Sequence, residues 1–212
     1  MIPKLHYISK GSSPEEHLIN IQKACSAGVE LVQLNLEDIS EKQVLKFAKK
    51  AKEITTHFQT RLILNEYYKI VKEIKADGVH FKKSNFYATK VRNHLYPWQI
   101  IGANANNLKD CEKLLSNNVD YITLYPFKEA SIKDNGLTSL GLNGYSAIID
   151  ALKTETPIIG FGNITTKDVN AILETGISGI GVTEQITDNF DNIKIFNQLL
   201  KASIIDEKRH RF

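Results

Sequence analysis

Short apolar runs alternate along the chain with longer segments in which apolar residues recur every three to four positions. The run at residues 157–162 is nearly continuous in apolar residues and glycine, which is typical of a strand buried on both faces of a parallel sheet. The longer segments have the period of amphipathic helices. The expected strands are residues 4–9, 31–35, 61–65, 78–81, 99–105, 121–127, 157–162 and 179–183. The expected helices are residues 14–27, 41–58, 67–75, 87–95, 108–117, 142–152, 166–174 and 193–202.

The repeated order of strand and helix indicates the fold class. Eight such alternations in 212 residues predict an α/β fold, a single (β/α)8 TIM barrel. An open, doubly wound sheet is the structural alternative. No linker or low-complexity segment divides the chain, so we expect one domain over residues 1–203. Residues 204–212 are expected to form a short, frayed C-terminal tail.

Local chemistry at the helix ends supports these boundaries. Ser13 is placed to cap the first helix, and Ser40 with Gln43 three residues later predicts a capping box at the second. Gly28 and Gly176 fall where the first and seventh helices should stop, since glycine enters the left-handed region without penalty.

Composition and charge exclude several classes of protein. The formal charge of +3 is small and the lysines are scattered, which argues against a nucleic-acid-binding protein. No apolar stretch approaches the roughly 20 residues that cross a bilayer, and the chain enters its first strand without a signal-peptide pattern, so a cytoplasmic protein is expected. Cys25 and Cys111 lie in different helical segments and are expected to be buried thiols, not a redox pair or metal cluster.

Polar residues, with more amides than charges, follow most of the expected strands. In a (β/α)8 barrel the catalytic groups come from these strand ends. The Gly160-Phe161-Gly162-Asn163 turn brings small residues to the end of the seventh strand, where backbone N–H groups can approach an anion. This turn predicts a phosphate site.

In order and spacing, several segments resemble thiamine phosphate synthases, from about Leu5 to about Leu200. The matching segments are residues 28–34, 62–65, 76–80, 100–102, 119–121, 140–142 and 157–162, together with Lys133. The resemblance implies coupling of an aminopyrimidine methyl diphosphate to a thiazole phosphate, which releases pyrophosphate with the help of Mg²⁺. Partners are then small phosphorylated pyrimidine and thiazole substrates, or a related small molecule, with a possible homo-oligomer.

The resemblance also implies roles for residues that match the family pattern. Lys133 stands as the family's phosphate-contacting lysine and is the candidate catalytic residue. Gln33 and Asn65 stand in the pyrimidine and pyrophosphate surroundings, and Gly162 keeps the first glycine of the phosphate turn. His80 belongs to a family-like Gly-Val-His segment, and we expect it to be a packed, hydrogen-bonded residue.

Other positions depart from the family pattern. The family's Arg and Lys after the second strand are Asn35 and Glu37, and its two metal-binding aspartates fall on Glu66 and Asn85. The remaining substrate-binding candidates that differ from the pattern are Asn104, Ser131, Asn163, Thr183 and Glu184. Glu184 places a carboxylate where the family holds a phosphate, and two like charges repel each other. Lys82 and Lys83 are candidate substitute cations for the diphosphate.

Three functions follow from this comparison. The first is a thiamine phosphate synthase-like transferase whose activity is reduced or altered. The second is a non-catalytic family member that binds a small molecule or a protein partner. The third is an isomerase like the related thiazole tautomerase, which is disfavoured because that enzyme's histidine has no counterpart in residues 124–129.

Overall fold

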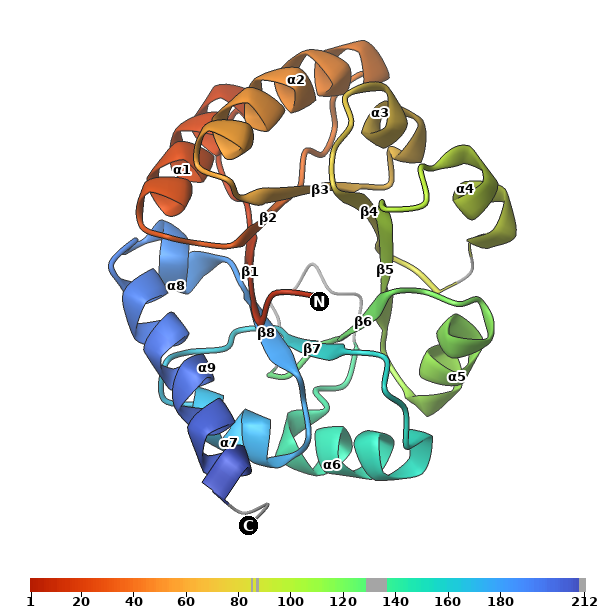
Figure 1. The fold of residues 1–212 in the computed structure, drawn as a ribbon, viewed down its shortest axis with the longest axis vertical. Coiled ribbons are helices and arrows are strands. Elements are labelled where there is room, and N and C mark those ends of the chain that lie inside the picture. The colour runs from red at the N-terminus through yellow and green to blue at the C-terminus, as the bar shows by residue number, and fades with distance from the viewer. Residues whose placement is uncertain (85, 87, 129–136, 210–212) are drawn as a thin grey trace.

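A closed barrel of parallel strands, surrounded by helices, forms the molecule (Figure 1). The computed structural model describes residues 1–84, 86, 88–128 and 137–209, with side chains up to residue 201. The strands pair in sequence order and β8 closes onto β1. This arrangement confirms the single (β/α)8 TIM barrel and excludes the open sheet.

All eight predicted strands are present, with small shifts at their ends. They are β1 (Leu5–Ile8), β2 (Leu31–Leu34), β3 (Arg61–Asn65), β4 (Gly78–Phe81), β5 (Ile100–Ala105), β6 (Tyr121–Leu124), β7 (Ile158–Phe161) and β8 (Gly179–Val182). The largest shift is in β6, which ends at Leu124 and not at residue 127. Pro126 has no N–H group to donate to a ladder, so the strand stops before it.

Helices lie outside the barrel (Figure 1). They are α1 (Pro14–Ser26), α2 (Glu41–His57), α3 (Tyr68–Glu73), α4 (Ala88–His94), α5 (Leu108–Ser116), α6 (Gly141–Leu152), α7 (Val169–Glu174), α8 (Glu184–Thr187) and α9 (Asn192–Arg209). The sequence did not predict the short α8, and α9 runs beyond its predicted end at residue 202. The division at residue 203 and the frayed tail remain predictions.

Helix α7 is shorter than predicted because a local turn replaces its first residues. The Asp168 carboxylate accepts hydrogen bonds from the backbone N–H and the hydroxyl of Thr165, at 2.9 and 2.8 Å. Such side-chain bonds satisfy the backbone outside the helix. The predicted caps are confirmed elsewhere: Ser13 caps α1, and Ser40 with Gln43 forms the capping box of α2.

The barrel core contains large aromatic side chains as well as aliphatic ones. Tyr7, Tyr121 and Tyr145 are fully buried. Gly102 makes room for Tyr121, because a Cβ atom added there would lie 2.0 Å from the tyrosine ring. The two cysteines are buried as predicted, and burial raises the pKa of Cys111 to about 12. None of the helices in the described ranges is both long and apolar enough to span a bilayer.

The first residues of the chain cover the amino-terminal end of the barrel. The Met1 carbonyl accepts a hydrogen bond from Arg61 at the start of β3, and the Lys4 carbonyl accepts one from the Ile180 N–H in β8. In Figure 1 this end of the chain is drawn across the centre of the ring. The opposite end of the barrel, where the strands have their carboxyl termini, holds the candidate site.

Candidate active site

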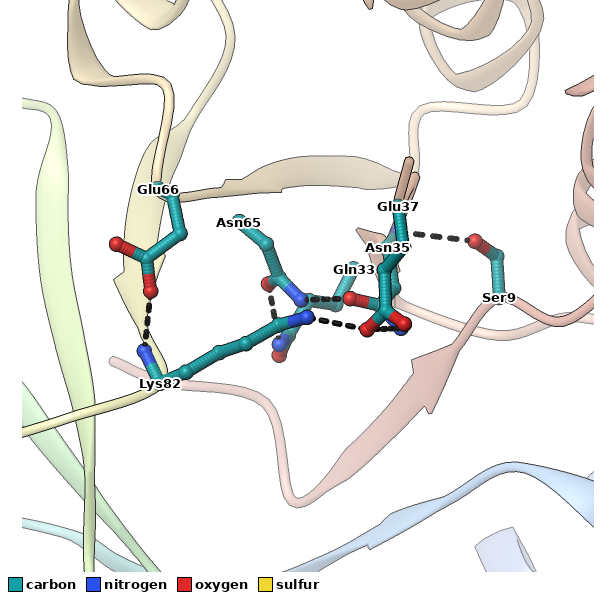
Figure 2. A network of polar contacts seen from close by, with 7 residues as sticks. All are labelled: Ser9, Gln33, Asn35, Glu37, Asn65, Glu66 and Lys82. Carbon is teal, nitrogen blue, oxygen red and sulfur yellow. Dashed lines mark hydrogen bonds and ion pairs between the residues drawn. The ribbon is translucent and has the colours of Figure 1, made fainter. Parts of the chain in front are cut away.

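Three amide side chains form a directed chain of hydrogen bonds at the ends of β2 and β3 (Figure 2). Gln33 Nε2 donates to Asn65 Oδ1 at 2.6 Å, and Asn65 Nδ2 donates to Asn35 Oδ1 at 2.5 Å. Asn35 Nδ2 in turn donates to a Glu37 carboxylate oxygen at 3.3 Å. Because the Glu37 carboxylate at the end of this chain only accepts, Asn35 donates to it, and the orientations of Asn65 and Gln33 follow in turn.

Lys82, one residue beyond β4, reaches across to this chain of amides (Figure 2). Its ammonium group forms an ion pair with the Glu37 carboxylate, and its backbone N–H donates to the Glu66 carboxylate at 2.6 Å. The Glu37 side chain is more than half exposed, so the pair is partly screened by water. Lys82 thus contacts both acidic residues. Glu37 stands where the family has a lysine, and Glu66 stands where it has a metal-binding aspartate.

A buried serine and histidine support the backbone of Asn35. Ser9 Oγ accepts a hydrogen bond from the Asn35 N–H at 3.2 Å and lies 2.8 Å from His17 Nδ1. Burial lowers the pKa of His17, against the raising effect of the Gly11 carbonyl and of nearby carboxylates. The neutral imidazole accepts the serine hydroxyl hydrogen, so the Ser9 oxygen is left to accept from Asn35.

His80 lies in β4 and joins the buried Tyr121 to Asn104 in the cavity lining. Its Nδ1 is 2.9 Å from the Tyr121 hydroxyl, and its Nε2 is 2.8 Å from Asn104 Oδ1. An amide oxygen only accepts, so Nε2 carries the hydrogen and Nδ1 accepts from the tyrosine. The Nδ2 hydrogens of Asn104 are then directed elsewhere. His80 is the packed, hydrogen-bonded residue that its sequence context predicted.

Burial keeps two core histidines neutral, and this predicts acid sensitivity. Burial lowers the pKa of His6 to about 3 and of His80 to about 4, whereas an unfolded histidine titrates near 6.5. Between those values the unfolded chain binds more protons. The free energy of unfolding should therefore fall as pH drops from about 6.5 to 4, with each histidine adding a slope of up to about 1.4 kcal/mol per pH unit.

Urea unfolding at pH 7, 6 and 5 measures this slope. The His80→Gln variant should have a shallower pH dependence, whereas His57→Gln, at an exposed position on α2, should keep the wild-type slope. A wild-type free energy of unfolding that is constant from pH 7 to pH 5 would contradict the assignment of two neutral buried histidines.

The amide chain and Lys82 line a cavity of about 480 Å³ at the carboxyl ends of β2 to β5. Its lining also includes Asn104, Asn106 and Tyr125, so five amide groups and one ion pair face the same space. The sequence-predicted residues that the structure brings together here are Gln33, Asn35, Glu37, Asn65, Lys82 and Asn104. Lys83 is exposed at the surface beside them.

A second cavity, of about 430 Å³, lies at the ends of β7 and β8 and shares Tyr125 with the first. Its lining brings together the predicted residues Gly162, Asn163, Thr183 and Glu184. Gly162 has φ 115° and Asn163 has φ 50°, so both lie in the left-handed region. A Cβ atom at Gly162 would also meet the Phe127 backbone nitrogen at 2.8 Å. Asparagine tolerates this region better than most residues, which explains how the turn keeps its shape with Asn163.

Two lysines at the edge of the second cavity were not identified from the sequence. Lys10, two residues beyond β1, pairs with Glu184 at 3.0 Å, and Lys128, in the segment after β6, pairs with Asp168 at 2.6 Å. The available signal for Lys10 was its position after a strand. For Lys128 it was its place in the segment that also carries Lys133. Ser131, Lys133 and Asn85 lie outside the described residues.

Glu66 is suited to a hard cation such as Mg²⁺. Its carboxylate is exposed and accepts the Lys82 N–H through one oxygen, and a carboxylate has about four acceptor sites. The Glu37 carboxylate lies at the other end of the Lys82 side chain, against its ammonium group (Figure 2). Among the described residues no group of three or more acidic, histidine or cysteine side chains is arranged for a metal. Mg²⁺ needs only one or two carboxylates when substrate phosphates and water complete its octahedron.

Known proteins of one family resemble the chain over most of its length. The profile of the thiamine monophosphate synthase family matches residues 5–186. A thiamine-phosphate synthase of Flavobacterium johnsoniae is 33% identical over 97% of this chain and 100% of its own length. The enzyme of Flavobacterium psychrophilum is 34% identical over 95% of this chain and 99% of its own. A thiamine phosphate pyrophosphorylase structure from Pyrococcus furiosus superposes with a TM-score of 0.77 at 18% identity, covering 93% of this chain and 96% of that one.

Proposed function

Since the chain belongs to the thiamine monophosphate synthase family, we propose that it couples an aminopyrimidine methyl diphosphate to a thiazole and releases pyrophosphate. The observation that carries this proposal is the pair of adjoining cavities that share Tyr125. One cavity is lined by amides and a lysine, and the other by a turn with exposed backbone. A reaction that joins two substrates needs two neighbouring sites at the same face of the barrel.

The chemistry requires charge stabilisation more than acid or base catalysis. The bond between the pyrimidine methylene carbon and the diphosphate oxygen breaks, pyrophosphate leaves with the electron pair, and the thiazole nitrogen forms the new bond to carbon. The Lys82 ammonium neutralises charge that develops on the leaving oxygen. Gln33 and Asn65, whose amide orientations are fixed by their hydrogen bond, position the pyrimidine.

Magnesium fits this scheme next to Lys82. We propose that Glu66 would hold Mg²⁺ together with the diphosphate, and that the Lys82 ammonium group, which pairs with Glu37, would contact a phosphate oxygen. The bound ion supplies Lewis-acid stabilisation of the leaving group. The protein side chains fix the diphosphate and exclude water from the developing cation.

Two other functions stay as alternatives within the family. A non-catalytic member would bind a neutral small molecule, or a protein partner, in one of the cavities without metal. The tautomerase-like isomerase has less support, because the sequence from Tyr125 to Leu140 contains no histidine. For the coupling reaction we propose a cytoplasmic setting and allow a homo-oligomer, since its substrates are products of intermediary metabolism.

Calorimetric titration of the aminopyrimidine methyl diphosphate separates the synthase from a non-catalytic binder. With Mg²⁺ present we expect binding, and with EDTA we expect the affinity to fall by at least about tenfold, which corresponds to about 1.4 kcal/mol. Glu66→Gln should weaken binding only when Mg²⁺ is present. Glu112→Gln, on the exposed face of α5, is the matched control and should bind as the wild type does. Equal binding with and without Mg²⁺ would contradict the proposed metal site.

A further inference from the structure

The carboxyl ends of β6 and β7 are joined by a side chain that comes from outside the barrel. Tyr145 belongs to α6, in the outer ring of helices (Figure 1), and its side chain is fully buried. Its hydroxyl donates to the Leu124 carbonyl at 2.8 Å and accepts a hydrogen bond from the Phe161 N–H at 3.1 Å. Leu124 and Gly160 form the last paired position of these two strands. One phenol therefore bonds to both strands at the point where their ladder ends.

The Tyr145 ring fits closely between the two strands. Burial raises the pKa of Tyr145, so its hydroxyl keeps the hydrogen that it donates. The Leu124 carbonyl is the nearer acceptor, because the Phe161 carbonyl lies at 3.4 Å. Gly160 provides room for the ring, since an added Cβ atom would lie 2.9 Å from Tyr145 Cε2 and 3.1 Å from the hydroxyl oxygen. The hydroxyl is thus held in place by its two hydrogen bonds and by packing.

Helix α6 is itself fixed to the segment that follows β6. The Leu140 N–H donates to the Pro126 carbonyl at 2.9 Å. The next N–H along the chain, that of Gly141, donates to the Phe127 carbonyl, also at 2.9 Å. The Phe127 ring packs on the Tyr145 ring, with the centroids 5.3 Å apart. These contacts hold the start of α6, and with it Tyr145, against the segment after β6.

Two aromatic rings stand where the two cavities meet. Tyr125 lines both cavities, and Phe161 lines the β7–β8 cavity. Their rings stack with centroids 5.3 Å apart and an interplanar angle of 29°. Tyr145 bonds to the Phe161 N–H and to the carbonyl directly before Tyr125. The Phe161 carbonyl accepts the Phe127 N–H at 2.8 Å, so both backbone groups of Phe161 are held.

The Tyr125 backbone has its own anchors on the β5 side. Its N–H donates to the Ala105 carbonyl at 3.0 Å, and its carbonyl accepts the Asn106 side-chain N–H at 2.7 Å. Residues of β5 and its following turn therefore hold Tyr125 from one side, whereas Tyr145 provides the bond toward β7. Loss of the Tyr145 hydroxyl would loosen Phe161 relative to Tyr125 while leaving Tyr125 attached to β5.

We infer that Tyr145 is a positioning residue for the coupling reaction: it fixes the Phe161 ring against Tyr125 and so sets the relative placement of the two bound substrates. The inference rests on the proposed function and adds a residue that is not among the described lining residues of either cavity. A reaction between two bound molecules depends steeply on their relative placement. Because the proposed diphosphate contacts on β2 to β4 stay in place, loss of the hydroxyl should affect kcat more than KM.

Tyr145→Phe removes the hydroxyl and keeps the ring. We expect kcat to fall by about tenfold or more, with the KM of each substrate within about twofold of the wild-type value. Thr60→Val is the matched control, because the buried Thr60 hydroxyl also donates to a backbone carbonyl, that of Val29 at 3.0 Å, at the amino-terminal end of the barrel. This control should also lower thermal stability but keep the wild-type kcat. Gly160→Ala pushes on the Tyr145 ring without removing its hydroxyl, so it should lower kcat too, and it replaces Tyr145→Phe if that variant does not fold.

Amide hydrogen exchange of the free proteins, followed by NMR, locates the effect without turnover. In Tyr145→Phe the Phe161 amide loses its hydroxyl acceptor and should exchange faster than in the wild type. The amides of β3 should be unchanged in this variant. Thr60→Val should leave the exchange of the Phe161 amide unchanged.

A wild-type kcat in Tyr145→Phe would overturn the inference, since the tyrosine would then only stabilise the fold. Unchanged exchange of the Phe161 amide would overturn it as well, and so would an equal fall of kcat in Thr60→Val. If the wild-type protein itself forms no product, the coupling reaction is contradicted, and the role of Tyr145 in that reaction is contradicted with it. Product from the wild type together with an unaffected Tyr145→Phe variant contradicts only the role of Tyr145.

Discussion

Replacing Lys82 by alanine is expected to lower kcat/KM for the coupling reaction by about 10- to 150-fold. A charge-assisted hydrogen bond contributes about 1.5 to 3 kcal/mol, and each 1.4 kcal/mol changes a rate by about tenfold. Lys82 lines the cavity that holds the amide chain, and its ammonium group pairs with Glu37. Because the lysine acts on charge that develops as pyrophosphate leaves, kcat should fall together with kcat/KM.

Removing the charge of the partner residue is expected to have the opposite effect on phosphate binding. Glu37→Gln frees Lys82 and is expected to raise the affinity for inorganic pyrophosphate, a product that binds without reacting further. Lys42→Ala, at an exposed position on α2, is the control for loss of a lysine and should leave kcat/KM unchanged. If Lys82→Ala retains wild-type kcat/KM in protein with native circular dichroism, another group neutralises the diphosphate and our assignment is wrong.

Replacing Gly102 by alanine should destabilise the barrel by at least about 3 kcal/mol. The added Cβ atom would lie 2.0 Å from the ring of Tyr121, which is fully buried and hydrogen-bonded to His80. Inserting one methyl group into a packed core costs about 1 to 3 kcal/mol, and more where the neighbour cannot move. For a chain of this length the midpoint of thermal unfolding should drop by about 6 to 12 °C.

Gly28→Ala is the matched control for this substitution. Unlike Gly102, Gly28 has a left-handed backbone, with φ 91°, but a Cβ atom there would meet nothing within 4 Å. Its cost should be limited to conformational strain of about 1 to 2 kcal/mol. Scanning calorimetry compares the two variants. A smaller loss at Gly102 than at Gly28 would show that Tyr121 shifts freely, against the packing described above.

The barrel itself was predictable because its signals are local. Each strand is a short apolar run followed by a helix with the appropriate period, and both kinds of signal repeat along the whole chain. The caps at Ser13 and Ser40 are equally local and were confirmed. Helix α8 escaped prediction because its four residues are too few for a helical period to be recognised.

The ion pairs at the carboxyl ends of the strands could not be predicted because they join residues far apart in the sequence. Lys10 and Glu184 are 174 positions apart, and Lys82 and Glu37 are 45 apart. From the sequence, Glu184 was interpreted as a bare negative charge at a phosphate site. The closed barrel places β8 beside β1, which gives this carboxylate a lysine partner and changes the meaning of the substitution.

The hydrogen bonds among the amide residues also could not be predicted from the sequence. Family resemblance indicated Gln33 and Asn65 separately, and Asn35 as a substrate-binding candidate at which the family's cation is lost. In the structure these residues form one hydrogen-bonded chain, and Asn35 also connects it to Glu37 and, through its backbone, to Ser9 (Figure 2). Asn35, which departs from the family pattern, thus takes part in the hydrogen bonds that organise the cavity lining.

One measurement tests the central claim, that the two adjoining cavities form a coupling site, most directly. Purified protein is incubated with the aminopyrimidine methyl diphosphate, Mg²⁺ and either the thiazole phosphate or the thiazole alcohol, and the products are identified by mass spectrometry. We predict thiamine phosphate or thiamine in amounts equal to the pyrophosphate released. No thiamine product from folded protein, under conditions in which a thiamine-phosphate synthase reacts, would contradict the account.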